Sequence, residues 1–211
     1  MKTFRNIIFF SILTCSIVAC GGAKKEENAD EKSSANAFEA LSDMGKEMEK
    51  VSNKMKERRA KGDTLAMPYA DLQKFLPSSI NDYKTSEPSG ASINMTGMSY
   101  SSAEVKYKND KDGWIKISII DYNQAYGLYS AASAMWAMGI SVDTPEEKAN
   151  GIKLDDQIGG WEVFKKKHNK ANITLGVGER FWVNVEANEQ TNTELVKSIA
   201  KSIDLAKLAS L

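Results

Sequence analysis

Two pairs of segments in this chain alternate apolar and polar residues on either side of a short turn. They comprise residues 103–107 with 115–119, around Asn109-Asp-Lys-Asp-Gly113, and residues 173–177 with 181–185, around Gly178-Glu179. Successive side chains of a strand point to opposite faces, so this alternation predicts two β-hairpins, each with one buried face. A doubly wound parallel sheet is disfavoured, because its strands are apolar on both faces. The pattern therefore favours an antiparallel sheet.

A segment with the helical spacing of apolar residues follows each hairpin. The first stripe consists of Leu128, Ala132, Met135, Trp136 and Gly139 and ends before Thr144-Pro145; the second consists of Val196, Ile199, Ala200 and Ile203. Thr191 and Glu194 have the spacing of a capping box at the start of the second helix. When the helices pack on the sheet, their apolar stripes and the apolar face of the sheet bury one another. This predicts an α+β layer architecture.

The two halves of the body also share a spacing motif. The spacing Leu-x3-Ile-x2-aromatic occurs at Leu76, Ile80 and Tyr83 and again at Leu154, Ile158 and Trp161. It indicates an approximate duplication of a strand–hairpin–helix unit within one α+β domain, residues 65–211, with helices packed on the antiparallel sheet. The repeated order of strands and then a helix resembles the PsbP/Mog1 class of α+β proteins. This topological resemblance implies little about function.

Four short motifs of the body resemble those of an uncharacterised group of bacterial envelope proteins. They are Leu76-Pro77, Gly160-Trp161, Gly178-Glu179-Arg180-Phe181-Trp182-Val183 and Ile203-Asp204-Leu205-Ala206-Lys207-Leu208. They match the Leu-Pro start, the GW strand, the GxRFxV hairpin and the IDLxKL end of that group, and the resemblance covers most of the chain. It implies a fold and an envelope location, and it transfers no activity.

The N-terminus has the organisation of a secretory signal. Lys2 and Arg5 precede an apolar run over residues 7–19, which is shorter than the roughly 20 apolar residues of a spanning helix. The run ends in Ile17-Val18-Ala19-Cys20, which resembles the lipobox of bacterial lipoproteins. The resemblance implies diacylglycerol on the Cys20 sulfur and cleavage after Ala19, so that residues 1–19 are the signal peptide. The alternative is an ordinary cleaved signal in which Cys20 is incidental.

Lipidation also accounts for the cysteines and alters the charge. Cys15 leaves with the signal and Cys20 is acylated, so the processed chain keeps no thiol and no disulfide. Several acyl chains on one residue anchor a protein stably in a membrane. The precursor has 28 basic and 28 acidic residues, and processing removes Lys2 and Arg5, which leaves 26 against 28. Proteins that bind nucleic acid carry an excess of basic residues. The charge of this chain therefore gives no indication of nucleic-acid binding.

A tether and a helix are expected between the anchor and the body. Residues 20–34 are small and charged, which is typical of a flexible linker. Within them, Lys24-Lys25-Glu26-Glu27 is similar to the surface-export signal of some lipoproteins, or is plain linker composition. Residues 35–62 form an amphipathic helix by pattern, closed by Gly62-Asp63. Its stripe has coiled-coil spacing and consists of Leu41, Met44, Met48, Val51 and Met55.

Two interpretations of that helix remain open. In the first it packs on the body or spaces the body from the membrane. In the second its stripe binds a partner helix or a second copy of the chain, although methionine at core positions specifies partners poorly.

The sequence contains few candidates for catalysis or metal binding. His168 is the only histidine, lies among lysines and is expected to be exposed. The acidic pairs Asp155-Asp156, Glu146-Glu147 and Asp110/Asp112 lie in turn-like contexts, whereas glycosidases need two facing carboxylates. Asn109-Asp-Lys-Asp-Gly113 lacks the later Glu of a calcium loop and is expected to be a turn. No catalytic, cofactor-binding or metal-binding residues are therefore assigned.

Methionine and tryptophan provide the remaining alternatives. The pairs Met95/Met98 and Met135/Met138 contain the soft thioethers that suit Cu(I), but core packing is the favoured interpretation. Two interpretations are open for the tryptophans of the strands, Trp114, Trp161 and Trp182. They line an open face for an apolar or sugar ligand, or they pack beneath the N-terminal helix. Packing beneath the helix is the favoured interpretation.

The sequence thus predicts an envelope lipoprotein, anchored in the outer membrane with its body periplasmic or surface-facing. Its partner is membrane lipid through acylated Cys20, and its body is expected to be a non-enzymatic binding or interaction module. The alternatives are an envelope hydrolase that uses dispersed carboxylates or serines, or a carrier of a small ligand or lipid.

Overall fold

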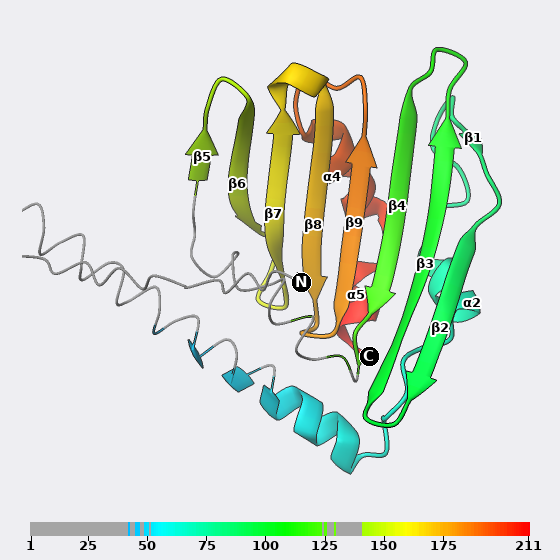
Figure 1. Cartoon of the computed structure of the whole chain (residues 1–211), viewed down its shortest axis with the longest axis vertical. Helices are drawn as coiled ribbons and strands as arrows, with labels where there is room; N and C mark the ends of the chain where they lie inside the picture. The colour runs from blue at the N-terminus through cyan, green and yellow to red at the C-terminus, as the bar shows by residue number, and fades with distance from the viewer. Residues whose placement is uncertain are drawn as a thin grey trace, which may run out of the picture.

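An antiparallel sheet of nine strands forms the centre of the protein (Figure 1). The computed structural model describes residues 42, 45, 46, 49, 50, 52–123, 125, 129 and 141–211. The strands are β1 (Lys84–Thr85), β2 (Ser89–Met95), β3 (Met98–Lys108), β4 (Trp114–Asp121), β5 (Ser141–Asp143), β6 (Glu147–Lys153), β7 (Ile158–Lys165), β8 (Lys170–Val177) and β9 (Phe181–Ala187). Their order is β1-β3-β4-β9-β8-β7-β6-β5, and β2 also pairs with β3. The predicted antiparallel α+β architecture is confirmed.

Both predicted hairpins are present, and their turns have the expected chemistry. In the turn between β3 and β4, the Asn109 side-chain oxygen accepts hydrogen bonds from the backbone N–H groups of Lys111 (2.9 Å) and Gly113 (2.7 Å). In the turn between β8 and β9, Gly178 and Glu179 have φ angles of 62° and 51°. Positive φ at two consecutive turn residues matches the twist of the flanking strands.

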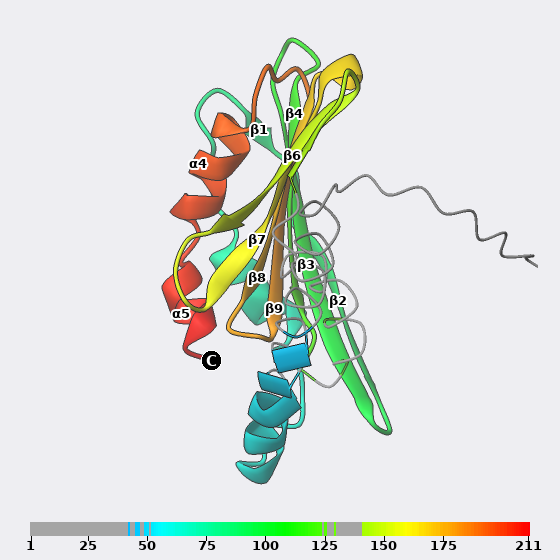
Figure 2. The same ribbon diagram turned by 90° about the vertical axis from the view of Figure 1, so that its left-hand side faces the viewer.

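Helices α4 (Glu194–Ser202) and α5 (Leu205–Ala209) lie on one face of the sheet (Figure 2). Helix α2 (Tyr69–Leu72) adds Leu72 to the same core and is followed by the short 3₁₀ turn η1 (Gln73–Phe75). A second 3₁₀ turn, η2 (Lys166–His168), connects β7 to β8. The stripe predicted for the second helix is buried as expected on α4 and its C-cap Ile203.

Two boundary predictions are wrong. The first helix residue of α4 is Glu194, whose backbone N–H bonds to the Asn192 side chain (2.9 Å), so Thr191 and Glu194 do not form a capping box. Likewise, Thr144-Pro145 does not end a helix, because β5 precedes it. Thr144 instead closes the β5–β6 turn, where its hydroxyl accepts from the Glu147 N–H (3.1 Å). In both places a local side-chain hydrogen bond defines a turn that the periodicity did not reveal. The stripe from Leu128 to Gly139 lies outside the described residues.

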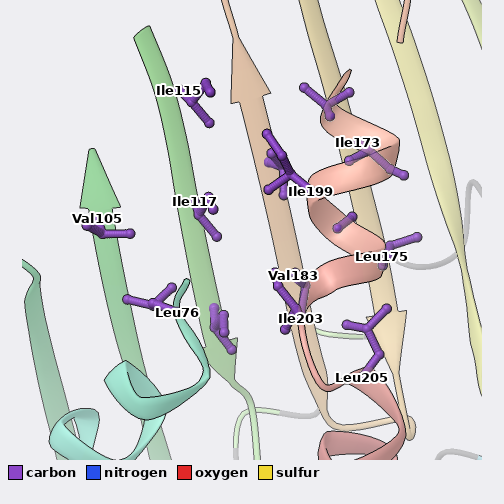
Figure 3. Close-up of a cluster of buried hydrophobic side chains, with 14 of the residues drawn as sticks. Leu76, Val105, Ile115, Ile117, Ile173, Leu175, Val183, Ile199, Ile203 and Leu205 are labelled. Carbon is purple, nitrogen blue, oxygen red and sulfur yellow. The ribbon is translucent and has the colours of Figure 1, made fainter. Parts of the chain in front are cut away.

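The core fills the space between the sheet and α4–α5 (Figure 3). Alternate residues of β3, β4, β8 and β9 are buried, and the chain segment around Leu72 and Leu76 covers the end near β3. Burying a valine, leucine, isoleucine or phenylalanine side chain contributes about 1.5–3 kcal/mol to the stability of the fold relative to leaving it exposed. Tyr107 belongs to this core: its hydroxyl donates to the Pro77 carbonyl, and burial raises the pKa of Tyr107 to about 12.

The two copies of the Leu-x3-Ile-x2-aromatic motif adopt different local structures. Ile80 and Tyr83 form an isolated bridge outside the named strands, whereas Ile158 and Trp161 both belong to β7. The motif therefore does not by itself establish a duplication.

The N-terminal helix is described over part of its predicted length. Residues 52–60 are helical, and Gly62 follows with a φ of 79°, as expected for a helix end. Met55 is half-buried; the other stripe residues, Leu41, Met44, Met48 and Val51, lie outside the described residues, as do Ala19, Cys20 and residues 20–34. Within the described part of the chain, no helix has the length and hydrophobicity needed to cross a membrane.

Candidate functional site

A groove of about 460 Å³ opens between the α2–η1 segment and the α4–α5 end of the chain. Its lining residues are Met67, Asp71, Lys74, Phe75, Leu76, Pro77, Ser202, Asp204, Lys207 and Leu211. The two walls come from sequence segments far apart in the chain, which meet because both pack on the same face of the sheet. Small-molecule sites in proteins commonly have volumes of about 300–1,000 Å³, so this groove is large enough for one.

Apolar residues and charged side chains of both signs line the groove. Leu76 is buried and Phe75 partly buried, and the Lys207 ammonium lies 5.6 Å from the centroid of the Phe75 ring. Lys74 and Asp71 form an exposed ion pair at 2.7 Å. Exposed ion pairs are weak, so these groups remain available to a ligand. The arrangement suits a ligand with an apolar body and a charged or polar end.

A second cluster of polar groups surrounds the buried guanidinium of Arg180, between β8 and β9. Its Nε and Nη2 atoms donate to the two carboxylate oxygens of Asp121, at 2.9 and 2.7 Å. Asp121 is fully buried at the end of β4 and also accepts from the backbone N–H groups of Met67 (2.8 Å) and Asn123 (2.9 Å). This bidentate geometry is the strongest form of such a pair.

The same guanidinium also connects the segment that follows the N-terminal helix to Leu211 after α5. Its Nη1 atom donates to Asp63 (2.9 Å), just after the N-terminal helix, and to the carbonyl of Leu211 (3.2 Å). The Asn123 amide adds hydrogen bonds to Asp63 (2.8 Å) and to the Leu65 carbonyl (2.7 Å). Burial lowers the pKa of Arg180, but hydrogen bonding and charge from Asp121 and Asp63 outweigh it, and the net pKa is raised.

The N-terminal helix meets this cluster through the adjacent residue Glu179. The ammonium groups of Lys50 and Lys54 each lie 3.0 Å from a Glu179 carboxylate oxygen, and that side chain is 8% exposed. Burial and the neighbouring Arg180 charge lower the pKa of Arg58 on the same helix. Because the positive charges of Arg58 and Arg180 balance the negative charges of Asp63 and Asp121, we interpret the cluster as a structural lock and not as a reaction centre.

The acidic pairs singled out in the sequence lie in separate turns. Asp156 pairs with Lys153 (2.7 Å), Glu146 with Lys167 (2.6 Å) and Asp110 with Lys84 (2.6 Å). The structure brings none of these pairs to the groove. His168 is exposed at the end of η2, as predicted.

The aromatic and methionine candidates are dispersed as well. Trp114, Trp161 and Trp182 are half-buried at strand positions that alternate with the buried core residues, and Trp182 contacts Tyr122 with ring centroids 6.1 Å apart. Met95 pairs with Met98 at the tip of the β2–β3 hairpin, and Met135 and Met138 lie outside the described residues. In the described part of the chain, no three His, Cys, Asp or Glu side chains are grouped to hold a metal ion.

Sequence reasoning missed the groove and the Arg180 cluster. One signal for the cluster was present: Asp121 continues the buried phase of Ile115, Ile117 and Ile119 along β4. A carboxylate in such a position requires a buried partner. The groove had no local signal, because its walls come from segments more than a hundred residues apart.

Comparison with family models, with curated proteins and with solved structures finds no match to this chain.

Proposed function

We propose that this chain is a lipid-anchored protein of the bacterial envelope whose α+β body is a binding module. The observation that carries the binding role is the groove between α2–η1 and α4–α5. It combines an apolar surface with charged groups and is built on a filled core. The lipobox-like residues Ile17-Val18-Ala19-Cys20 support the anchor. The anchor is proposed to lie in the outer membrane.

The anchor is tested by replacing Cys20 with alanine in the full chain. Without the sulfur no thioether to diacylglycerol forms, so we expect loss of the acyl label and of membrane retention after expression in a bacterial host. Radiolabelled fatty acid incorporation and membrane fractionation measure the two effects. Cys15→Ala is the matched control and should change neither. Unchanged retention of Cys20→Ala would contradict the proposal.

The binding role is tested by filling the groove. Ser202 lines it at the end of α4, and its hydroxyl donates to the carbonyl three residues earlier (2.7 Å). Ser210 makes the same local hydrogen bond at the end of α5 (2.7 Å), and it does not belong to the groove lining. Ser202→Trp should block the groove, while Ser210→Trp introduces the same bulk at a matched helix end.

Native mass spectrometry of the membrane-extracted protein gives the readout. We expect the unmodified chain and Ser210→Trp to carry the same bound small molecule and Ser202→Trp to lose at least about nine-tenths of it. Bare protein in all three spectra, or equal occupancy in Ser202→Trp, would rule out the groove as a binding site. The mass of the molecule also decides the alternative: a lipid mass identifies the chain as a lipid carrier.

We further infer that the body arose from two related halves. The strand order supports this, because β2-β3-β4 and β9-β8-β7 are two antiparallel three-strand units that meet at the β4–β9 pair. The different conformations of the Leu-x3-Ile-x2-aromatic motifs then reflect divergence of the segments that precede each unit.

A further inference from the structure

The two edges of the sheet differ in length and in protection. At one edge β5 has only three residues, and its Asp143 pairs with Lys166 at 2.5 Å. At the other edge β1 and β2 both pair with β3 and are separated by residues 86–88, which include Glu87 and Pro88. Short length, charge and proline are the usual means by which a soluble protein prevents its edge strands from pairing.

The strand β2 has none of these protections. Its seven residues, Ser-Gly-Ala-Ser-Ile-Asn-Met, include no charge and no proline, and six of the seven are exposed. One side of β2 pairs with β3 over its whole length, from Ser89 opposite Glu104 to Met95 opposite Met98. Its other side pairs with no strand in the part of the chain that the structure describes. This leaves a free backbone edge about 23 Å long.

Apolar side chains accompany this edge. Four large hydrophobic side chains are exposed among the described residues, and two of them lie at β2. Met95 is 57% exposed at the end of the strand. Tyr69 is 42% exposed on α2, and its backbone N–H donates to the Ser92 hydroxyl (2.9 Å). Tyr69 also lies close to Gly90, where an added Cβ would be 2.9 Å from the ring. An arriving strand would thus meet both backbone hydrogen-bonding groups and apolar surface.

We propose that β2 pairs in antiparallel fashion with β2 of a second copy of this chain, joining two sheets across a two-fold axis. The sequence of β2 is complementary to itself about Ser92. In that register Ala91 lies opposite Ile93 of the second copy, Gly90 opposite Asn94 and Ser89 opposite Met95. Each larger side chain meets a smaller one, and no like charges meet. Such an interface is isologous, and dimers with two-fold symmetry are the commonest homo-oligomers.

The register predicts which residue controls the pairing. Ala91 is exposed, so a long side chain there is compatible with the folded monomer. The two Ala91 residues of a dimer are diagonal neighbours on one face of the sheet, roughly 7–8 Å apart, within reach of long charged side chains. Lysine at both positions, or glutamate at both, would therefore repel across the axis, whereas one lysine and one glutamate would attract.

The test measures the mass of the full chain in detergent by sedimentation equilibrium. We expect the unmodified chain to be a dimer, and Ala91→Lys and Ala91→Glu each to raise the dimer dissociation constant at least about tenfold. An equimolar mixture of the two variants should recover most of the dimer. Because recovery requires two folded partners, it separates a lost interface from a lost fold. Ser141→Lys is the matched control: it places the same charge on an exposed serine of the opposite edge and should leave the dimer intact.

Three results would overturn this proposal. A monomeric unmodified chain would do so, as would a dimer that Ala91→Lys leaves unchanged. A dimer weakened equally by Ser141→Lys would place the interface elsewhere. The proposal does not depend on the groove or on the anchor, since neither contributes a residue to β2.

Discussion

Replacing Arg180 with methionine should lower the free energy of unfolding by about 3–5 kcal/mol. The methionine fills much of the same volume but provides no charge and no donors. Asp121 would then be left fully buried without its bidentate partner, while Asp63 and the Leu211 carbonyl would each lose a hydrogen bond. Urea unfolding followed by circular dichroism measures the change.

A second substitution separates the loss of charge balance from the loss of packing. Met67 and Asn123 donate to different carboxylate oxygens of Asp121, so Asp121→Asn keeps an acceptor for only one of the two N–H groups and removes the negative charge. Added to Arg180→Met, it should restore at least about 1 kcal/mol, because the uncompensated buried charge is gone. Asp156→Asn breaks the exposed pair with Lys153 and should leave stability nearly unchanged. If Arg180→Met were no more disruptive than Asp156→Asn, the cluster would not be a structural lock.

Replacing Gly160 with alanine should cost about 3 kcal/mol, at the upper end of the range for overpacking. A Cβ built on Gly160 lies 1.9 Å from the carbonyl oxygen of Thr174 and 2.9 Å from the Cα of Leu175. Both are backbone atoms of the paired strand β8, so no side-chain rotation relieves the contact. The two strands must separate locally, and the hydrogen bonds of the β7–β8 ladder weaken with them.

The neighbouring glycine provides the control for this prediction. A Cβ at Gly159 meets only the Ile152 carbonyl oxygen, at an ordinary 3.6 Å. Gly159→Ala should therefore change stability by less than about 1 kcal/mol, and a small gain is expected because alanine loses less backbone entropy on folding. Urea unfolding of both variants at the same pH measures their free energies of unfolding for this comparison. Equal effects of the two substitutions would mean that the β7–β8 strands are not packed as closely as described.

The local elements of the fold follow from the sequence alone. The alternation in β3, β4, β8 and β9 identifies the two hairpins, and the stripe of α4 identifies the last helix. These signals are local, because a strand or helix shows its buried face within a few residues. The errors at Thr191 and Thr144 arose where a side chain bonds to a nearby backbone group, which hydrophobic periodicity does not record.

The groove, the Arg180 cluster and the open edge of β2 could be identified only from the tertiary structure. Arg180 and Asp121 are 59 residues apart and meet only because β4 pairs with β9. The groove likewise requires α2–η1 and α4–α5 to pack side by side, and β2 becomes an edge only once β3 and β4 are paired. The sequence by itself determined hairpins, a helix, an α+β class and the expectation of a lipid anchor. Only the tertiary structure decided which polar groups converge and which strand keeps one side without a paired strand among the described residues, since both depend on long-range neighbours that no local pattern encodes.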